Sequence, residues 1–284
     1  MKLSKLKKLP LIKKLFDSDP EVSVVHLKGV IGSGGALNKG LTLASVQEQL
    51  EQAFTRKDVK AVALVINSPG GSPVQSDLIG RRIRQLAEEN EVRVIAFCED
   101  VAASGGYWLA CSADMIYVLP SSVIGSIGVI SAGFGFPELI KRYGIERRVR
   151  TAGISKSTLD PFKEEKEEDI ERLQGILGDI HEDFKDWVRT RRAGRLQDEE
   201  DILFNGEFWA GRKAVDLGLV DEVGDLHSVL RKEYGKDVKL FEAEAKQPLM
   251  KRLMGAFSDP MARSFVTTFE ERLESRSLFS RFGL

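Results

Sequence analysis

The feature that most constrains the fold of this chain is the alternation of short β-rich runs with segments of helical periodicity. Helices are predicted over residues 43–54 and 74–89, where apolar side chains recur at helical spacing. Strands are predicted by five runs rich in β-branched and apolar residues: 22–31, 59–66, 92–99, 115–119 and 145–153. Strands that alternate with helices need crossover connections, so the chain is predicted to be α/β with a mainly parallel sheet.

A long amphipathic helix is predicted after Pro161. The segment opens with acidic residues and ends with basic ones, an order that favours a helix because it opposes the helix macrodipole. Its apolar residues recur at intervals of three and four: Ile170, Leu173, Ile176, Leu177, Ile180, Phe184, Trp187 and Val188.

Composition places the chain among ordinary globular proteins, because 42% of its 284 residues are hydrophobic and 30% are charged. Its 42 Lys+Arg nearly balance its 43 Asp+Glu. No general positive field therefore attracts nucleic acid, and no nucleic-acid partner is predicted.

The first fifteen residues, MKLSKLKKLPLIKKL, form a basic amphipathic segment. One interpretation is a solvated start that packs lightly on the domain, and the other is a weak contact with anionic lipid. The segment is too short and too charged to span a bilayer, and no later stretch is long enough. The expected location is therefore the cytoplasm, with peripheral contact to the cytoplasmic membrane as the alternative.

The cysteines and histidines indicate no metal site. Cys98 and Cys111 lie in apolar surroundings, which is typical of buried free thiols in a reducing compartment. His26, His181 and His227 are scattered and lack the spacing of zinc ligands. No cofactor is predicted.

Two strand ends carry residues suited to chemistry. Gly70 and Gly71 of INSPGGSP follow one strand, where glycines can present backbone N–H groups without a side chain in the way. Ser104 follows the next strand and precedes a short helix, whose N-terminus can stabilise an oxyanion. The alternatives are a tight turn for the glycines and a helix N-cap for the serine.

A nucleophilic serine needs a base, and none of the three histidines is well placed for that role in the sequence. The other candidate is a lysine that is neutral when it acts. Lys156 lies in a loop of small residues with apolar flanks, RTAGISKSTLDPF, unlike lysines in charged clusters. A surface role is the alternative for any single lysine.

The order of five motifs resembles the signal peptide peptidase A family of serine-lysine peptidases. The motifs are INSPGG, ASGGYW, GSIGV, AGISKSTLDPF and FWAGRKAVDLGLVDEVG, and the resemblance covers about residues 22 to 242. It implies the fold of the Clp proteolytic subunit and the crotonases, a ββα superhelix with a mainly parallel sheet. The region after Ser104 lacks the histidine of the Clp subunit, which favours the lysine branch.

The resemblance implies roles for the candidate residues. Ser104 would be the nucleophile, Lys156 the general base, and Ser126 of GSIGV a hydrogen-bond partner of the lysine amine. A turn serine is the equal alternative for Ser126. The oxyanion hole would use Gly71 and Gly70, together with Gly105. Because the lysine must be deprotonated, activity is expected to rise toward alkaline pH.

The resemblance also implies partners and organisation. Substrates would be signal peptide remnants or other unfolded peptides, and the chain would form a closed homo-oligomeric ring, octameric by resemblance, with serine and lysine from neighbouring subunits. Three parts are predicted: a basic segment at 1–20, the peptidase domain at 21–245 and a C-terminal helical extension at 246–284.

Two other function classes remain open from the sequence. A crotonase-like acyl-CoA enzyme would use the same scaffold but needs an acidic catalytic residue and leaves Lys156 unexplained. The second class is a catalytically silent scaffold that binds peptides or membrane surfaces. It remains open because no motif by itself proves that the chain turns over a substrate.

Overall fold

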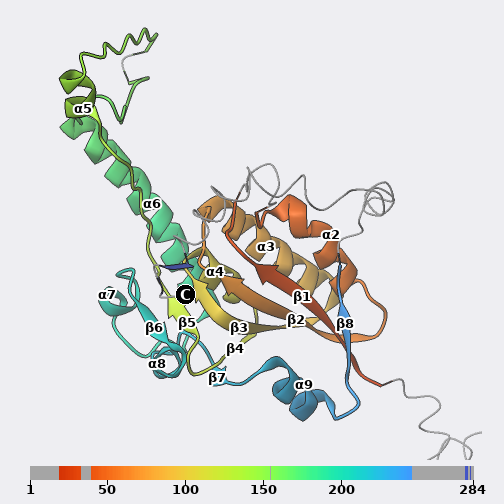
Figure 1. The fold of residues 1–284 in the computed structure, drawn as a ribbon. Helices are drawn as coiled ribbons and strands as arrows, with labels where there is room; N and C mark the ends of the chain where they lie inside the picture. Colours follow the sequence, from red (N-terminus) through yellow and green to blue (C-terminus); the bar gives the residue numbers. More distant parts are fainter. Residues whose placement is uncertain (1–18, 33–39, 154, 245–278, 281, 283–284) are drawn as a thin grey trace, which may run out of the picture.

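The structure, a computed structural model, describes residues 19–32, 40–153, 155–244, 279–280 and 282. Its centre is an eight-stranded sheet with the order β6-β5-β3-β2-β1-β8, while β4 pairs with both β3 and β7 (Figure 1). The strands are β1 (Glu21–Lys28), β2 (Val59–Ser68), β3 (Arg93–Ala103), β4 (Met115–Val118), β5 (Val123–Gly125), β6 (Phe208–Ala210), β7 (Glu222–Val223) and β8 (Lys239–Glu242). The helices are α2 (Leu43–Phe54), α3 (Pro73–Asn90), α4 (Gly105–Ala110), α5 (Pro137–Arg142), α6 (Glu167–Arg191), α7 (Glu200–Leu203), α8 (Gly211–Asp216) and α9 (Leu226–Tyr234).

The sheet confirms the predicted α/β class. Among the described strands, every pairing is parallel except that of β5 with β6. The predicted helix at 43–54 coincides with α2, and that at 74–89 lies within α3. Helical periodicity located these helices closely because each packs one apolar face on the sheet.

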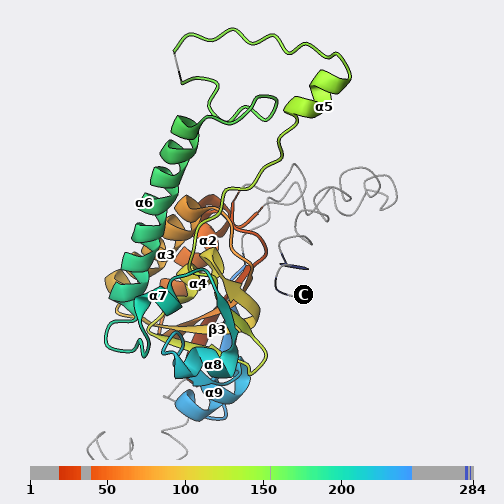
Figure 2. The same cartoon turned by 90° about the vertical axis from the view of Figure 1, so that its left-hand side faces the viewer.

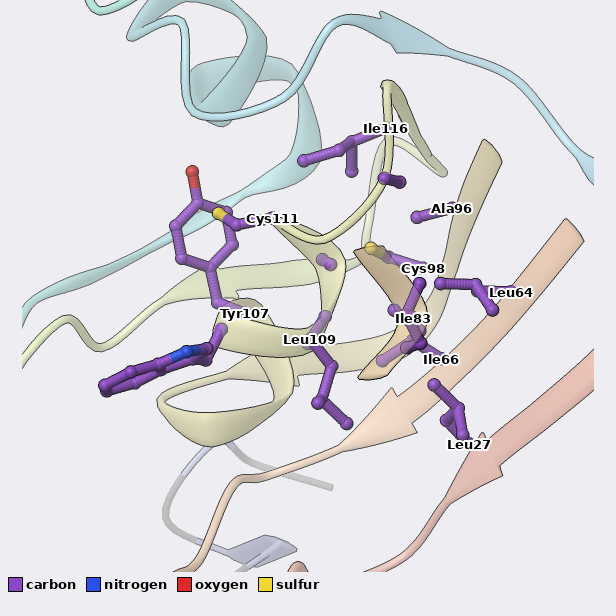
Figure 3. Close-up of a cluster of buried hydrophobic side chains, with 14 of the residues drawn as sticks. Leu27, Leu64, Ile66, Ile83, Ala96, Cys98, Tyr107, Leu109, Cys111 and Ile116 are labelled. Carbon is purple, nitrogen blue, oxygen red and sulfur yellow. The ribbon is translucent and has the colours of Figure 1, made fainter. Parts of the chain in front are cut away.

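The main core lies between one face of the sheet and the helices α2, α3 and α4, with the end of α6 beside α4. Alternation along β1 divides its residues, since Val25 and Leu27 join this core while Val22 and Val24 face the smaller cluster beneath α9. Figure 3 shows side chains of the main core, with Cys98 and Cys111 among them. Both cysteines are free and buried, as predicted.

An arm projects from this body. We define the arm as residues 129–153 and 155–178, which run from β5 through α5 and return along the first half of α6 (Figure 2). The second half of α6 anchors it, because Phe184 stacks on Trp108 with ring centroids 4.6 Å apart. The Trp187 indole also donates a hydrogen bond to the Trp108 carbonyl at 3.0 Å.

The prediction of a strand at 145–153 is wrong, since these residues belong to no helix or strand. They lie in the arm and are exposed apart from a half-buried Val149, and a strand needs a neighbouring strand to satisfy its backbone groups. The β-branched residues of this segment would indicate a strand only if the segment entered the sheet.

Asp221, in the motif FWAGRKAVDLGLVDEVG, holds neighbouring parts of the fold together. The Arg192 side chain is 1% exposed, donates to the Gly218 carbonyl and pairs with Asp221 at 2.9 Å. The same carboxylate accepts the Ile116 N–H at 2.7 Å, so it joins α6, β4 and the motif. A buried guanidinium requires such a partner.

Several predictions fall outside the described residues. Only Asp19 and Pro20 of the basic segment 1–20 are described, and of the extension 246–284 only residues 279–280 and 282. Within the described part of the chain, no helix has the length and apolarity needed to cross a membrane.

Candidate active site

The ends of β2 and β3 bring the glycine pair and Ser104 together. These neighbouring strands pair in parallel as far as Ser68 and Ala102, with a shift of register between Ile66 and Ser68. The chain then leaves β2 through Gly70 and leaves β3 through Ser104. A Cβ atom placed on Gly70 would lie 2.7 Å from the Ser104 Cβ and 2.8 Å from the Gly105 nitrogen. The two motifs, separated in sequence, therefore form one site.

Ser104 has a backbone conformation that a non-glycine residue seldom adopts, with φ 52° and ψ −123°. Its N–H donates to the Gly125 carbonyl at 2.8 Å, and its carbonyl accepts from Tyr107 and Trp108 at 2.9 and 3.0 Å. Its side chain makes no capping hydrogen bond to α4. Ser104 thus occupies the N-cap position of α4 without capping the helix through its side chain, and its hydroxyl has no hydrogen-bond partner among the described residues. Backbone contacts on both sides hold this strained residue.

Two backbone N–H groups beside Ser104 are available as donors. Gly105 is the first residue of α4, so its N–H has no acceptor within the helix. The Gly71 N–H has no hydrogen-bond acceptor among the described residues. Gly70 differs, because its N–H already donates to the Ser68 hydroxyl at 3.2 Å. Gly71 and Gly105 are therefore better candidates than Gly70 for the two N–H donors of the predicted oxyanion hole.

A short bridge to Ile31 fixes the glycine loop. Ile31 donates its N–H to the Gly70 carbonyl at 2.9 Å and accepts the Ser72 N–H at 2.8 Å. A Cβ on Gly71 would lie 2.0 Å from the Ile31 carbonyl oxygen, so no other residue fits without moving the backbone. These contacts with Ile31 hold the loop, which keeps the Gly71 N–H in place.

Ser126 shares a cavity with Ser104. The cavity has a volume of about 270 Å³, and its wall consists of Pro69, Gly71, Pro73, Ser104, Ser126, Gly128, Val129, Ile130, Asn205, Gly206 and Phe282. Ser126 also has a positive φ, 53°, and its N–H donates to the Glu207 carbonyl at 2.6 Å. Two strained serines on one cavity wall are typical of a functional site.

Lys156 does not approach Ser104 within one chain. It is exposed in a turn of the arm, where its N–H donates to the Gly153 carbonyl at 3.3 Å. The start of α6 at Glu167 lies about 25 Å along the helix from Phe184, which packs on α4, because each helical residue adds about 1.5 Å. The segment that carries Lys156 lies at the outer end of the arm (Figure 2).

None of the three histidines lines the cavity. His26 pairs with Glu242 at 2.9 Å on β1, and His227 lies at the start of α9. His181 was not expected near the site, yet its Nε2 lies 3.1 Å from the Ile127 carbonyl, next to Ser126. The cavity residues Asn205 and Phe282 were missed as well, since nothing in the local sequence marks them.

Comparison with known proteins supports the interpretation of these motifs. The pattern of Peptidase family S49 matches residues 87–239, more than half of the chain. A relative from Synechocystis sp. that bears a protease name is 30% identical over 246 residues, covering 84% of each chain. "Serine protease SPPA, chloroplastic" of Arabidopsis thaliana is 29% identical over 232 residues, which cover 81% of this chain and 32% of that protein.

A further relative has an unrelated name. The protein named "Na(+)/H(+) antiporter NhaA" of Brucella abortus is 55% identical over 235 residues, 82% of this chain. The chain spans about a third of that relative, 32% of its length. The family pattern matches more than half of the chain and agrees with the motifs, so the chain belongs to peptidase family S49.

Proposed function

We propose that the chain is a serine endopeptidase in which Ser104 is the nucleophile. The observation that carries the proposal is the strained Ser104 on a cavity wall beside the N–H groups of Gly71 and Gly105. Among the residues that the structure describes, neither its hydroxyl nor these two N–H groups have a hydrogen-bond partner. This combination offers a nucleophile and two donors for an oxyanion. Membership in a peptidase family supports the same reaction.

In the proposed reaction, the neutral Lys156 amine takes the proton of the Ser104 hydroxyl. The oxygen attacks the peptide carbonyl carbon, and the negative charge develops on the carbonyl oxygen next to the N–H groups of Gly71 and Gly105. The protonated amine then gives its proton to the leaving nitrogen as the peptide bond breaks. Water hydrolyses the resulting ester and restores both residues. Ser126 would hold the lysine amine through its hydroxyl.

The lysine would come from a second copy of the chain. Within one copy the segment that carries Lys156 lies at the outer end of the arm, while Ser104 lies between β3 and α4 in the body. The arm exposes apolar side chains that a neighbouring copy would cover, among them Ile130, Phe134 and Leu139, of which Phe134 is 82% exposed. A closed ring, octameric by resemblance, would supply every Ser104 with a lysine.

The proposed substrates are signal peptide remnants or other unfolded peptides. The cavity wall combines Val129 and Ile130 with glycines and prolines, which suits an extended peptide with apolar side chains. Of the described residues on this wall, none carries a carboxylate. That composition gives no support to a crotonase-like enzyme with an acidic catalytic residue.

The test is covalent labelling with a fluorophosphonate, read by intact mass, together with cleavage of an unfolded protein. The native chain and a Lys141→Ala control, altered at another exposed lysine of the arm, should label and cleave. The variants Ser104→Ala and Lys156→Ala should do neither while keeping their native circular dichroism. Labelling of the Ser104→Ala variant at another residue would refute the assignment, and a native chain that neither labels nor cleaves would favour the silent scaffold.

Mixing the two inactive variants tests the origin of the lysine. If serine and lysine come from different copies, Ser104→Ala chains and Lys156→Ala chains unfolded and refolded together should regain part of the native activity. Each variant refolded alone should stay inactive. No recovery in a mixture that forms the native oligomer would place both residues in one copy.

A further inference from the structure

We infer that Phe208 forms an aromatic subsite of the Ser104 cavity and that Phe282 of this chain occupies it. The Phe282 segment is defined here as the described residues 279, 280 and 282. The inference rests on the proposed function for its catalytic consequence, while the binding it describes can be measured without catalysis. It assigns a preference for aromatic side chains to Phe208, which lies against the cavity residue Phe282.

The backbone holds Phe208 beside the cavity. Phe208 begins β6 and is the register partner of Gly125 in β5, the residue before Ser126. Its predecessor Glu207 accepts the Ser126 N–H at 2.6 Å. Two backbone contacts therefore tie Phe208 to the strand end that carries Ser126. The Phe208 backbone is thus held in a fixed position beside the cavity.

The Phe208 ring meets Phe282 edge to face, with centroids 5.1 Å apart and an interplanar angle of 75°. This is one of the geometries that aromatic pairs prefer, because the positive edge of one ring faces the negative face of the other. Phe208 remains 47% exposed in this contact, so its ring also faces solvent. A large apolar side chain left exposed next to a cavity is typical of a binding surface.

Phe282 itself lines the cavity, on the wall that also includes Ser104 and Ser126. The Phe282 N–H donates to the Phe279 carbonyl at 2.9 Å, so the segment turns there and does not run extended past Ser104. We therefore assign it as a reversible occupant that presents a phenyl ring, not as a peptide aligned for cleavage.

Occupation by the chain's own residue has two consequences. A covalently connected ligand competes at a high effective concentration, so a free peptide must displace Phe282 before it can use the subsite. A peptide with an aromatic side chain replaces the lost contact with Phe208, while an aliphatic peptide replaces it only in part. The subsite should thus favour aromatic peptides and be most accessible when Phe282 is removed.

Binding is tested with a fluorescent peptide of residues 275–284, SRSLFSRFGL, measured by anisotropy on full chains that carry Ser104→Ala. The additional change Phe282→Ala should increase the affinity for the peptide by about three- to tenfold, because it removes the competing ring. Phe279→Ala, a change on the same segment outside the cavity wall, should leave the affinity unchanged. Equal affinities in all three chains would overturn the inference.

Phe208 is tested in the Phe282→Ala background. Phe208→Ala should weaken binding of the peptide by about three- to tenfold, and Phe208→Tyr should restore it because the ring is retained. A peptide in which the residue matching Phe282 is alanine should bind weakly to every chain. Equal binding of both peptides, or a loss that Phe208→Tyr does not restore, would overturn the aromatic subsite.

Catalysis provides the second measurement. With matched peptides that differ only in Phe or Leu at one position, Phe282→Ala should lower KM several-fold for the Phe peptide. Phe208→Ala should remove the preference between the two peptides. If no chain cleaves either peptide, the proposed function fails and the anisotropy results still decide the subsite; if cleavage is normal and the preference is unaffected by Phe208→Ala, the subsite alone fails.

Discussion

Gly70 approaches Ser104 so closely that a Cβ at Gly70 would lie 2.7 Å from the Ser104 Cβ, a distance that real Cβ atoms do not show. The same atom would lie 2.8 Å from the Gly105 nitrogen and 3.0 Å from the Ala103 carbonyl oxygen. Backbone groups cannot yield as a flexible side chain can. The absence of a side chain at Gly70 therefore allows the two strand ends to meet around Ser104.

A methyl group at Gly70 should disrupt the site. Gly70→Ala is expected to reduce kcat/KM by about 10² or more, roughly the effect of misplacing an oxyanion donor. Its φ of 103° also disfavours alanine. Gly29→Ala is the matched control, since Gly29 has φ 99° and nothing lies within 4 Å of the position that a methyl group would take. Both variants should lose about 1 kcal/mol or more of stability from the backbone alone, but Gly29→Ala should retain activity. Equal activities would contradict the steric account.

His181 should act as a positioning residue for the Ser126 turn. A carbonyl only accepts hydrogen bonds, so His181 donates its Nε2–H to Ile127, between Ser126 and the cavity residue Gly128. His181→Ala leaves that carbonyl without its donor and should cost about 1–3 kcal/mol of stability, with a larger drop in kcat than change in KM.

The controls for this prediction are His181→Gln and Asp179→Ala. Glutamine can still donate from its side-chain amide and should restore part of kcat, while Asp179 is exposed on the same helix and its removal should be neutral. If His181→Ala loses stability but keeps its kcat, the contact of His181 with Ile127 is only structural and the prediction of a positioning role is wrong.

Removing the partner of Arg192 should destabilise the fold strongly. Asp221→Ala leaves a buried guanidinium unpaired and removes the acceptor of the Ile116 N–H, so the free energy of unfolding should fall by about 3–5 kcal/mol. Urea denaturation measures the change. Glu222→Ala, a change at the exposed neighbour, should alter stability by less than about 0.5 kcal/mol. A small effect of Asp221→Ala would mean that water or another group solvates Arg192.

Alkaline pH should weaken the fold through its buried thiols. Burial raises the pKa of Cys111 from 9.0 to about 11, because the thiolate would lie in the apolar core. Since the folded pKa is the higher one, this contribution to stability is complete below pH 9.0 and is lost as the pH rises toward about 11.

The expected loss is about 3 kcal/mol in the free energy of unfolding, from a pKa shift of about two units. Denaturation curves between about pH 7 and pH 11 should show a smaller fall for Cys111→Ala than for the native chain, although the truncation also lowers stability at every pH. The same slope in both chains would exclude Cys111 as the cause. Thiol reagents should label neither Cys98 nor Cys111 until the chain unfolds, because both are buried.

Local patterns in the sequence were sufficient for the elements of the body. Apolar periodicity predicted α2 at its observed bounds and the buried runs that became β2 and β3, because each of these segments buries a face against the same sheet. The positions of Gly71 and Ser104 after the carboxyl ends of two strands also followed from the pattern, while the structure showed that these strands are neighbours. The strand predicted at 145–153 failed because β-branched composition cannot tell a sheet strand from an exposed arm.

The sequence by itself determined the α/β class, the family motifs and the residues Ser104, Ser126 and Lys156 as candidates, because these depend on residue type and spacing along the chain. Only the tertiary structure decided that Ser104 is strained and does not cap α4 with its side chain, that Gly70 donates its N–H to Ser68, and that the segment carrying Lys156 lies at the outer end of an arm. The contacts of His181 with Ile127 and of Phe208 with Phe282 join residues that are 54 and 74 positions apart. No local pattern encodes such pairs, since they arise only when the packing of α6 and β6 brings distant segments to one cavity.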